Sequence, residues 1–177
     1  KEPSWTFGDT RTPPPLRGSF LRRRALPWTD EEACYAAEDL GLDPPEAKIL
    51  ARETSRGRTT TRISARSQRG SPWISLLVPA GYTVHAATIA DVKIEKLALR
   101  SSGRSGWRTL AFLGAQPDEE IEFVVTHSGV SREAFHVTDR TLGLPPAGRS
   151  LGRARDASGH APIHMGDGVV LAAPVAK

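Results

Sequence analysis

From about Trp73 to the end of the chain, short apolar runs alternate with turn residues, and this pattern limits the choice of fold more than any other feature. Runs of about four to eight residues have the length of β-strands and are too short for most helices. The segments between them are rich in Gly, Pro, Ser and Asp, which favour turns. Because helical segments that could cross over between parallel strands are missing, the pattern predicts an antiparallel β-sandwich and not an α/β sheet.

Period-two alternation predicts about seven to nine strands in this sandwich. Trp73-Ile74-Ser75-Leu76-Leu77-Val78 has the aromatic and branched content of a strand that is buried on both sides. The other predicted strands lie at 48–54, 58–66, 82–89, 92–99, 107–113, 121–127, 133–139 and 169–175. A sandwich core needs large residues, so five aromatics are expected there and not on a ligand platform: Trp73, Trp107, Phe112, Phe123 and Phe135.

Turn chemistry predicts how several strands are joined. Ser55-Arg56-Gly57 makes a hairpin of the first two strands, Ala90-Asp91 is a tight bend, and Ser128-Gly129-Val130-Ser131 joins 121–127 to 133–139 as a second hairpin. The chain contains no Asn, so its turns must use other residues in place of Asn-Gly. Residues 141–161, rich in Gly, Pro and Arg, are expected to form a long loop.

Alternation also predicts which side chains share a face in the first hairpin. Ile49 and Ala51 should lie on one side of their strand, with Leu50 opposite. In the second strand one face should look outward to water, and it consists of Arg58, Thr60, Arg62, Ser64 and Arg66.

The sequence divides into an irregular arm at 1–43 and the sandwich domain at 44–177. The arm holds Pro13-Pro14-Pro15 and is typical of a linker. Within it, Thr29 and Glu32 have the spacing of a capping box and predict one short helix at 30–39. Trp5 and Trp28 could dock the arm onto the sandwich or onto a neighbouring domain.

Composition excludes several classes of protein. The net charge is only +4, so no nucleic-acid partner is expected. The run Arg22-Arg23-Arg24 is expected to be exposed to water and not to bind phosphate or lipid. The single Cys34 forbids an internal disulfide and cannot alone bind zinc. No apolar run reaches the roughly 18–20 residues that span a bilayer. Because the chain starts at Lys1 without Met, we expect a piece of a larger protein.

The titratable residues suggest no catalytic, cofactor-binding or metal site. His160 and His164 are four apart, but Pro162 prevents the helix that would put both on one face, so a loop cluster is expected even with Asp167 nearby. His127 and His136 are expected on an ordinary strand surface.

Two further groups of residues have the composition of enzymatic sites. Ser128 follows His127 without a Gly-x-Ser-x-Gly context, and neighbouring residues of a strand face opposite ways, which disfavours a hydrolase. Asp118, Glu119 and Glu120 follow Pro117 in a turn, where solvated acids are normal, so glycosidase chemistry is not indicated.

The order of motifs in 44–177 resembles a known domain. Those motifs are Pro45-Glu46-Ala47, Ser67-Gln68-Arg69-Gly70-Ser71-Pro72, Val78-Pro79-Ala80-Gly81, Gly106 to Gly114, Val137 to Pro145, and Gly166-Asp167-Gly168-Val169-Val170. They are similar to the C-terminal, non-catalytic domain of bacterial membrane-associated zinc exopeptidases of peptidase family twenty-eight, related in layout to the endoplasmic-reticulum metallopeptidases.

The resemblance implies an accessory or interaction domain that is not itself an enzyme. Its partners would be the catalytic and membrane parts of its own parent chain, a zinc aminopeptidase, and it would lie on the periplasmic or extracellular face of a membrane. None of the family's metal-binding motifs is matched, so no catalytic residue is carried over and no cofactor is expected here.

The alternative is a free-standing β-sandwich module that binds carbohydrate or peptide. An exposed row of aromatic side chains would favour carbohydrate, whereas a bare sheet edge or an apolar patch would favour a partner.

Overall fold

The computed structural model describes residues 4–7, 23–24, 33–36, 41–95, 106–146, 149–157 and 168–176. The chain divides into two compact units, one formed by Asp43–Thr141 with Val170–Lys177 and the other by Lys1–Leu42 with Leu142–Val169. The first unit thus begins within one residue of the expected boundary at residue 44. It does not include Leu142–Val169, which the sequence-based division placed inside the sandwich domain.

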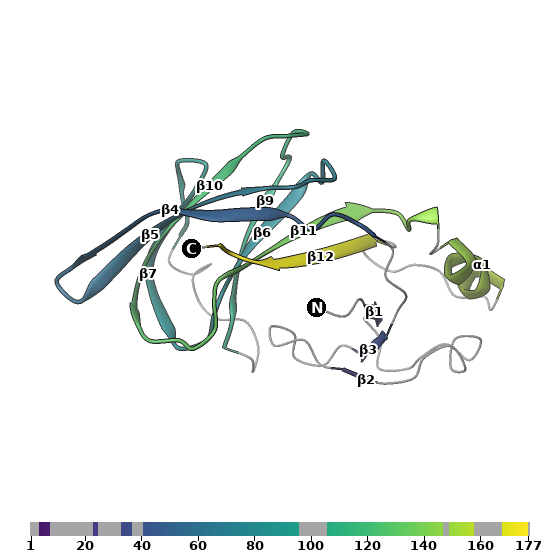
Figure 1. Cartoon of the computed structure of the whole chain (residues 1–177), viewed down its shortest axis with the longest axis horizontal. Helices are drawn as coiled ribbons and strands as arrows, with labels where there is room; N and C mark the ends of the chain where they lie inside the picture. The colour runs from purple at the N-terminus through teal and green to yellow at the C-terminus, as the bar shows by residue number, and fades with distance from the viewer. Residues whose placement is uncertain are drawn as a thin grey trace. The chain divides into compact units, whose positions relative to one another are not determined.

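The first unit is built on two antiparallel sheets, whose strands apart from β8 are labelled in Figure 1. One sheet has five strands in the order β4 (Glu46–Ser55), β5 (Arg58–Arg66), β10 (Ile121–Gly129), β7 (Tyr82–Ile89) and β8 (Val92–Lys93). The other has four in the order β12 (Gly168–Pro174), β11 (His136–Leu142), β6 (Trp73–Val78) and β9 (Arg108–Leu113). The predicted all-β sandwich is therefore confirmed.

The core lies between the two sheets and follows the period of two. On β10 the buried residues Ile121, Phe123 and Val125 alternate with half-buried ones. Phe123 pairs with Ile63 of β5 on one side and with Ile89 of β7 on the other, so one apolar row crosses three strands. The facing sheet contributes Leu76 and Val137, both without exposed surface. β6 is buried on both sides, as its composition predicts.

A β-bulge in β4 overturns one sequence-based assignment. Ile49 pairs with Ile63, but the register then shifts, and Ala51 lies opposite Arg62 on the outer face. A bulge adds a residue to one strand and so reverses the side to which the following residues point. The shift brings Arg52, which is exposed, opposite the buried Thr61.

The predicted hairpin between 121–127 and 133–139 is wrong. β10 pairs with β5 and β7, whereas β11 pairs with β6, so the connection crosses from one sheet to the other. The crossing begins at Gly129, whose φ of 92° favours glycine. Two apolar strands with a turn between them fit both a hairpin and a crossover, because alternation does not specify the partner strand.

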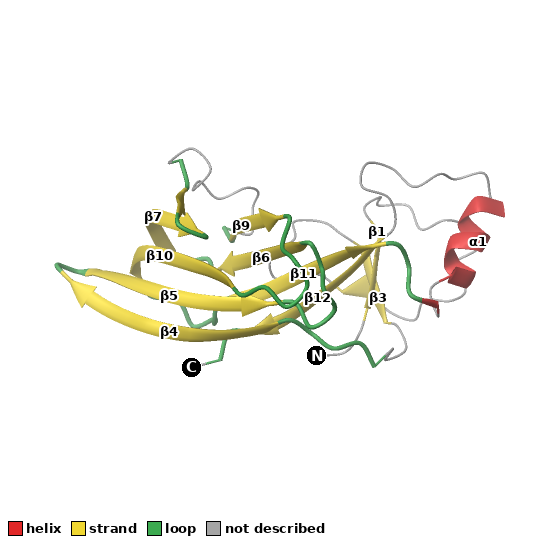
Figure 2. Ribbon diagram, turned by 90° about the horizontal axis from the view of Figure 1, so that it is seen from above, coloured by secondary structure: helices red, strands yellow, loops and turns green. Residues whose placement is uncertain are grey.

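The β4–β5 hairpin turns at Arg56-Gly57, as expected, and its tip extends past the ends of the neighbouring strands (Figures 1 and 2). The bend between β7 and β8 is also confirmed, with φ of 45° at Ala90 and 65° at Asp91. β8 ends at Lys93, so it is shorter than the predicted strand 92–99, whose last residues lie outside the described part.

The second unit contains a three-stranded sheet in the order β1 (Ser4–Phe7), β3 (Ala33–Ala36) and β2 (Arg23–Arg24). The predicted helix 30–39 is therefore wrong over Ala33–Ala36. A helix of this length is marginal on its own, and here the backbone pairs with β1 instead, with Tyr35 opposite Trp5. The capping box itself and Trp28 lie outside the described residues.

The loop expected at 141–161 contains a helix, α1 (Arg149–Ala157). Arg, Leu and Ala are good helix formers, and they outnumber the Gly residues that suggested a loop. Among the described residues, no helix is long and apolar enough to cross a membrane.

Candidate functional site

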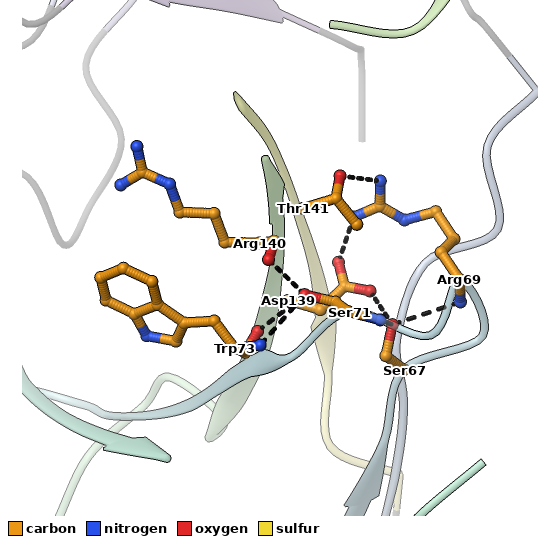
Figure 3. Close-up of polar contacts among 7 residues, drawn as sticks. All are labelled: Ser67, Arg69, Ser71, Trp73, Asp139, Arg140 and Thr141. Atoms are coloured by element: carbon orange, nitrogen blue, oxygen red, sulfur yellow. Dashed lines mark hydrogen bonds and ion pairs between the residues drawn. The ribbon is translucent and has the colours of Figure 1, made fainter. Parts of the chain in front are cut away.

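A buried polar network lies where the connection between β5 and β6 meets β11 (Figure 3). At its centre is Asp139, whose side chain has no exposed surface. One carboxylate oxygen accepts a hydrogen bond from Ser67 Oγ at 2.5 Å, and the other accepts one from Arg69 Nη2, also at 2.5 Å. The buried carboxylate is thus both hydrogen-bonded and paired with a cation, as buried charges require.

The same network fixes the backbone of the connection. Ser67 Oγ accepts hydrogen bonds from the N–H groups of Arg69 and Ser71, at 3.2 and 3.0 Å. Ser71 Oγ contacts the carbonyl oxygen of Arg140, and Arg69 Nη1 donates to Thr141 Oγ1 at 3.1 Å. The connection that passes from one sheet to the other is therefore tied to β11 by side chains as well as by packing.

This arrangement has a structural role. Asp139 lies inward on β11, beside Ile74 of β6, and is closed off from solvent. A general base or metal ligand must reach its substrate or ion, and the Asp139 carboxylate has no exposed surface and a hydrogen bond on each oxygen. Removal of one partner of such a pair leaves a buried charge and costs about 3–5 kcal/mol.

A second buried polar group is His127, on the inward face of β10 and only 4% exposed. Its Nε2 lies 3.1 Å from Thr61 Oγ1 on β5. The rings of Tyr82 and Phe135 flank it, with centroid distances of 4.4 and 5.6 Å. The expectation of an ordinary strand surface is wrong for His127, because β10 has no hairpin partner in β11 and instead faces the opposite sheet.

The environment of His127 disfavours its charged form. Burial is the main cause that lowers its pKa, and the positive charges of Arg52 and His85 lower it further. Nδ1 is buried and has no hydrogen-bond partner among the described residues. Because its pKa is lowered, the imidazole is neutral near pH 7. Its Nε2 is hydrogen-bonded to Thr61 Oγ1.

Ser128, next along the strand, faces the other way, as predicted. Its Oγ lies 2.7 Å from Nε2 of His85, which sits at a register shift where β7 pairs with β10. A hydrolase would add a carboxylate that orients the imidazole and donors that stabilise an oxyanion. Within the described part of the chain, the hydrogen bonds of the His85–Ser128 pair include neither, so the contact serves to hold the bulge.

The outer face of the five-stranded sheet is polar and carries charge pairs. Arg62 makes a bidentate contact with Glu122, with Nη2 at 2.8 and 3.0 Å from the two oxygens. Arg66 pairs with Glu46 at 2.9 Å, and Ser64 donates to Glu120 at 2.7 Å. The pKa of Glu120 is lowered mainly by the hydrogen bond from Ser64 and next by the positive charge of Lys48. The predicted outward position of the arginines is confirmed.

Beside these pairs the outer face is hollowed over about 350 Å³ at the edge of the sheet. The hollow is lined by Pro45, Glu46, Ala47, Lys48, Ser64, Arg66, Glu120 and Pro174. Along its rim the backbone of β4 pairs with the C-terminal segment, since Ile49 N donates to Ala176 O and Ala176 N donates to Ala47 O. Two cations and two carboxylates thus surround an open surface hollow.

Several other candidates fall on exposed positions or outside the described part. His136 is half-buried, its ring edge on Trp107 at 5.9 Å. Glu119 is exposed and caps its own turn by accepting a hydrogen bond from Gln116 N at 2.7 Å. His160, His164 and Asp167 lie outside the described residues, and within those that are described no group of three or more His, Cys, Asp or Glu could hold a metal ion.

Sequence reasoning overlooked Asp139, Arg69 and His85. A signal was present for Asp139, because it shares the face of Val137 in an alternating strand and an inward acid needs a buried partner.

Comparison with known proteins adds no relative, since no family model, curated protein or solved structure matches this chain.

Proposed function

We propose that this sandwich is a non-catalytic accessory domain of a larger zinc exopeptidase, and that it acts outside the cytoplasm. The observation that carries the proposal is the Asp139 network. Two motifs on which the family resemblance rests, Ser67 to Pro72 and Val137 to Pro145, meet in it. Their polar residues are enclosed and serve the fold, which is what a domain without its own chemistry would use them for.

In this proposal the outer face of the five-stranded sheet contacts the catalytic and membrane parts of the parent chain. Its charges are balanced, with Lys48 and Arg66 beside Glu46 and Glu120. A balanced face fits another folded protein better than nucleic acid or an anionic membrane, which require an excess of positive charge. Exposed pairs of this kind contribute little to stability, so they can exchange partners at low cost.

A second candidate, a module that binds an extended peptide, draws support from the edge of β4. That edge is paired with Ala176 near Lys48, and beyond Leu50 no described strand lies against it. A bare edge accepts a peptide strand through main-chain hydrogen bonds. The carbohydrate alternative lacks this support, because the large apolar side chains exposed on the described surface are aliphatic: Leu50, Val92, Leu113, Val130, Leu142 and Val170.

Charge reversal on the outer face tests the proposal. The double variant Lys48→Glu with Arg66→Glu should weaken binding of this chain to the remainder of its parent protein, supplied separately, by about tenfold or more. Arg132→Glu, exposed in the connection between β10 and β11 and outside the strands of this face, is the control and should bind as the unaltered chain does. Equal affinity in all three would contradict the assigned face, and tight binding of extended peptides by the isolated chain would favour the second candidate.

A further inference from the structure

At one end of the sandwich the turn before β7 lies close against the end of β10, where Gly129 pairs with Tyr82. The turn at Gly81 packs against the start of the connection at Gly129, and both glycines have positive φ, of 96° and 92°. A Cβ at Gly81 would lie 2.6 Å from the carbonyl oxygen of Val130, and a Cβ at Gly129 would overlap the carbonyl oxygen of Gly81. The two segments are therefore in direct backbone contact.

His127 precedes Gly129 on β10 and contacts the neighbouring strands β5 and β7 at this end of the sandwich. Through Thr61 it contacts β5, and through Tyr82 it contacts the residue that follows Gly81. Tyr82 in turn stacks on Phe135, at 5.4 Å with an interplanar angle of 13°, and Phe135 is the last residue before β11. The neutral imidazole thus fills the space between both sheets at this end.

The surroundings of His127 oppose a positive charge there. Thr61 and Phe135, which contact the imidazole, supply no negative charge to it. The groups whose charges act on the imidazole, Arg52 from β4 and His85 from β7, are both bases. At the start of β7, the carbonyl oxygen of Tyr82 accepts a hydrogen bond from Arg108 of β9 at 2.7 Å.

We infer that the His127 end of the sandwich is an acid-sensitive latch, closed while the imidazole is neutral and weakened when it takes up a proton. Protonation puts a cation in a buried site and near two basic side chains. The backbones at Gly81 and Gly129 are in close contact beside it, so hydration of the charged imidazole loosens this end of the sandwich.

The direction of the pH effect follows from the lowered pKa of the folded state. Above about pH 6.5 the imidazole is neutral in both the folded and the unfolded chain, and the latch has its full strength. As the pH falls below that value, the unfolded chain takes up the proton first, so folding loses stability. The loss stops growing once the pH is below the pKa of His127 in the folded protein.

The test compares the 177-residue chain with His127→Gln, which keeps a donor near Thr61 but cannot be charged. Thermal unfolding and amide hydrogen exchange are measured at pH 7.5 and pH 5.5. The unaltered chain should melt lower at pH 5.5, with faster exchange concentrated at 82–85 and 127–131. His127→Gln should lose this part of the pH dependence, whereas His136→Gln, a matched control on a half-buried histidine, should keep it.

A variant that does not depend on the packing of residue 127 completes the test. Arg52→Gln removes one opposing charge, so the imidazole signal of His127 in an NMR titration should move to a higher pKa. Equal pH dependence in His127→Gln and the unaltered chain would overturn the inference. So would an imidazole of His127 that titrates at or above the ordinary value for histidine.

Discussion

Asp139 and Glu122 show how differently two carboxylates of one sandwich contribute to stability. Asp139 has no exposed surface and is paired with Arg69, whereas Glu122 is one-third exposed and is paired with Arg62 on the outer face. Asp139→Ala should lower the free energy of unfolding by about 3–5 kcal/mol, because the guanidinium of Arg69 would remain buried without its partner. Glu122→Ala should cost no more than about 1 kcal/mol. Urea unfolding of both variants measures the difference, and similar losses would show that the Asp139 network is not the stronger element.

Trp107 supplies a second prediction at this scale. It is 4% exposed, next to His136, although it lies one residue before β9 begins. Trp107→Ala should cost about 3–5 kcal/mol, since it removes a large buried side chain. Leu113→Ala, at a position that is 64% exposed on the same strand, is the control and should change stability little. An unchanged melting temperature for Trp107→Ala would refute the structural role of this residue.

At the level of single residues, the sequence predicted positions that depend on local alternation and missed those that depend on distant pairing. The outward arginines of β5 follow from a period of two within one strand. His127 follows the same period, but its burial depends on the opposite sheet. The strand position of Arg52 opposite Thr61 depends on a bulge at Leu50, and no residue type in the sequence indicates a bulge at that point.

Among the elements, the bend between β7 and β8 stores avoidable strain. Ala90 has a φ of 45°, which is unfavourable for a residue with a Cβ. Ala90→Gly should therefore stabilise the protein by up to about 1 kcal/mol, and it keeps the hydrogen bond from its N–H to the carbonyl oxygen of Glu122. Ala86→Gly, on the exposed side of β7 with an ordinary strand conformation, should instead destabilise it by about 0.5–1 kcal/mol. The two melting temperatures should move in opposite directions; a shift of the same sign would contradict the strain.

Element type was largely readable from the sequence, whereas element partners were not. The strands of the two sheets were predicted with modest boundary errors because apolar alternation is local. The crossing from β10 to β11 was missed, since a turn between two strands does not reveal whether they share a sheet. The strand at Ala33–Ala36 was missed because a capping box is a weak signal compared with strand pairing. The helix at Arg149–Ala157 was missed because Gly content is a weak signal compared with the helix propensity of the whole segment.

The sandwich as a whole combines a buried structural network, an outer face of balanced charge and, by our inference, an acid-sensitive end. Each uses polar residues differently: Asp139 is enclosed, Glu120 is exposed beside the hollow, and His127 is held neutral. The proposal of an accessory domain rests on the first two features. The latch is independent of that proposal, because its test concerns the stability of this chain alone.

We propose that this chain supports a zinc exopeptidase without itself being an enzyme. The most direct test measures zinc content and aminopeptidase activity for the 177-residue chain and for the complete product of its gene, side by side. The account predicts bound zinc and turnover in the complete product and neither in the chain. Zinc and turnover in the chain itself would contradict it and direct attention to His160, His164 and Asp167.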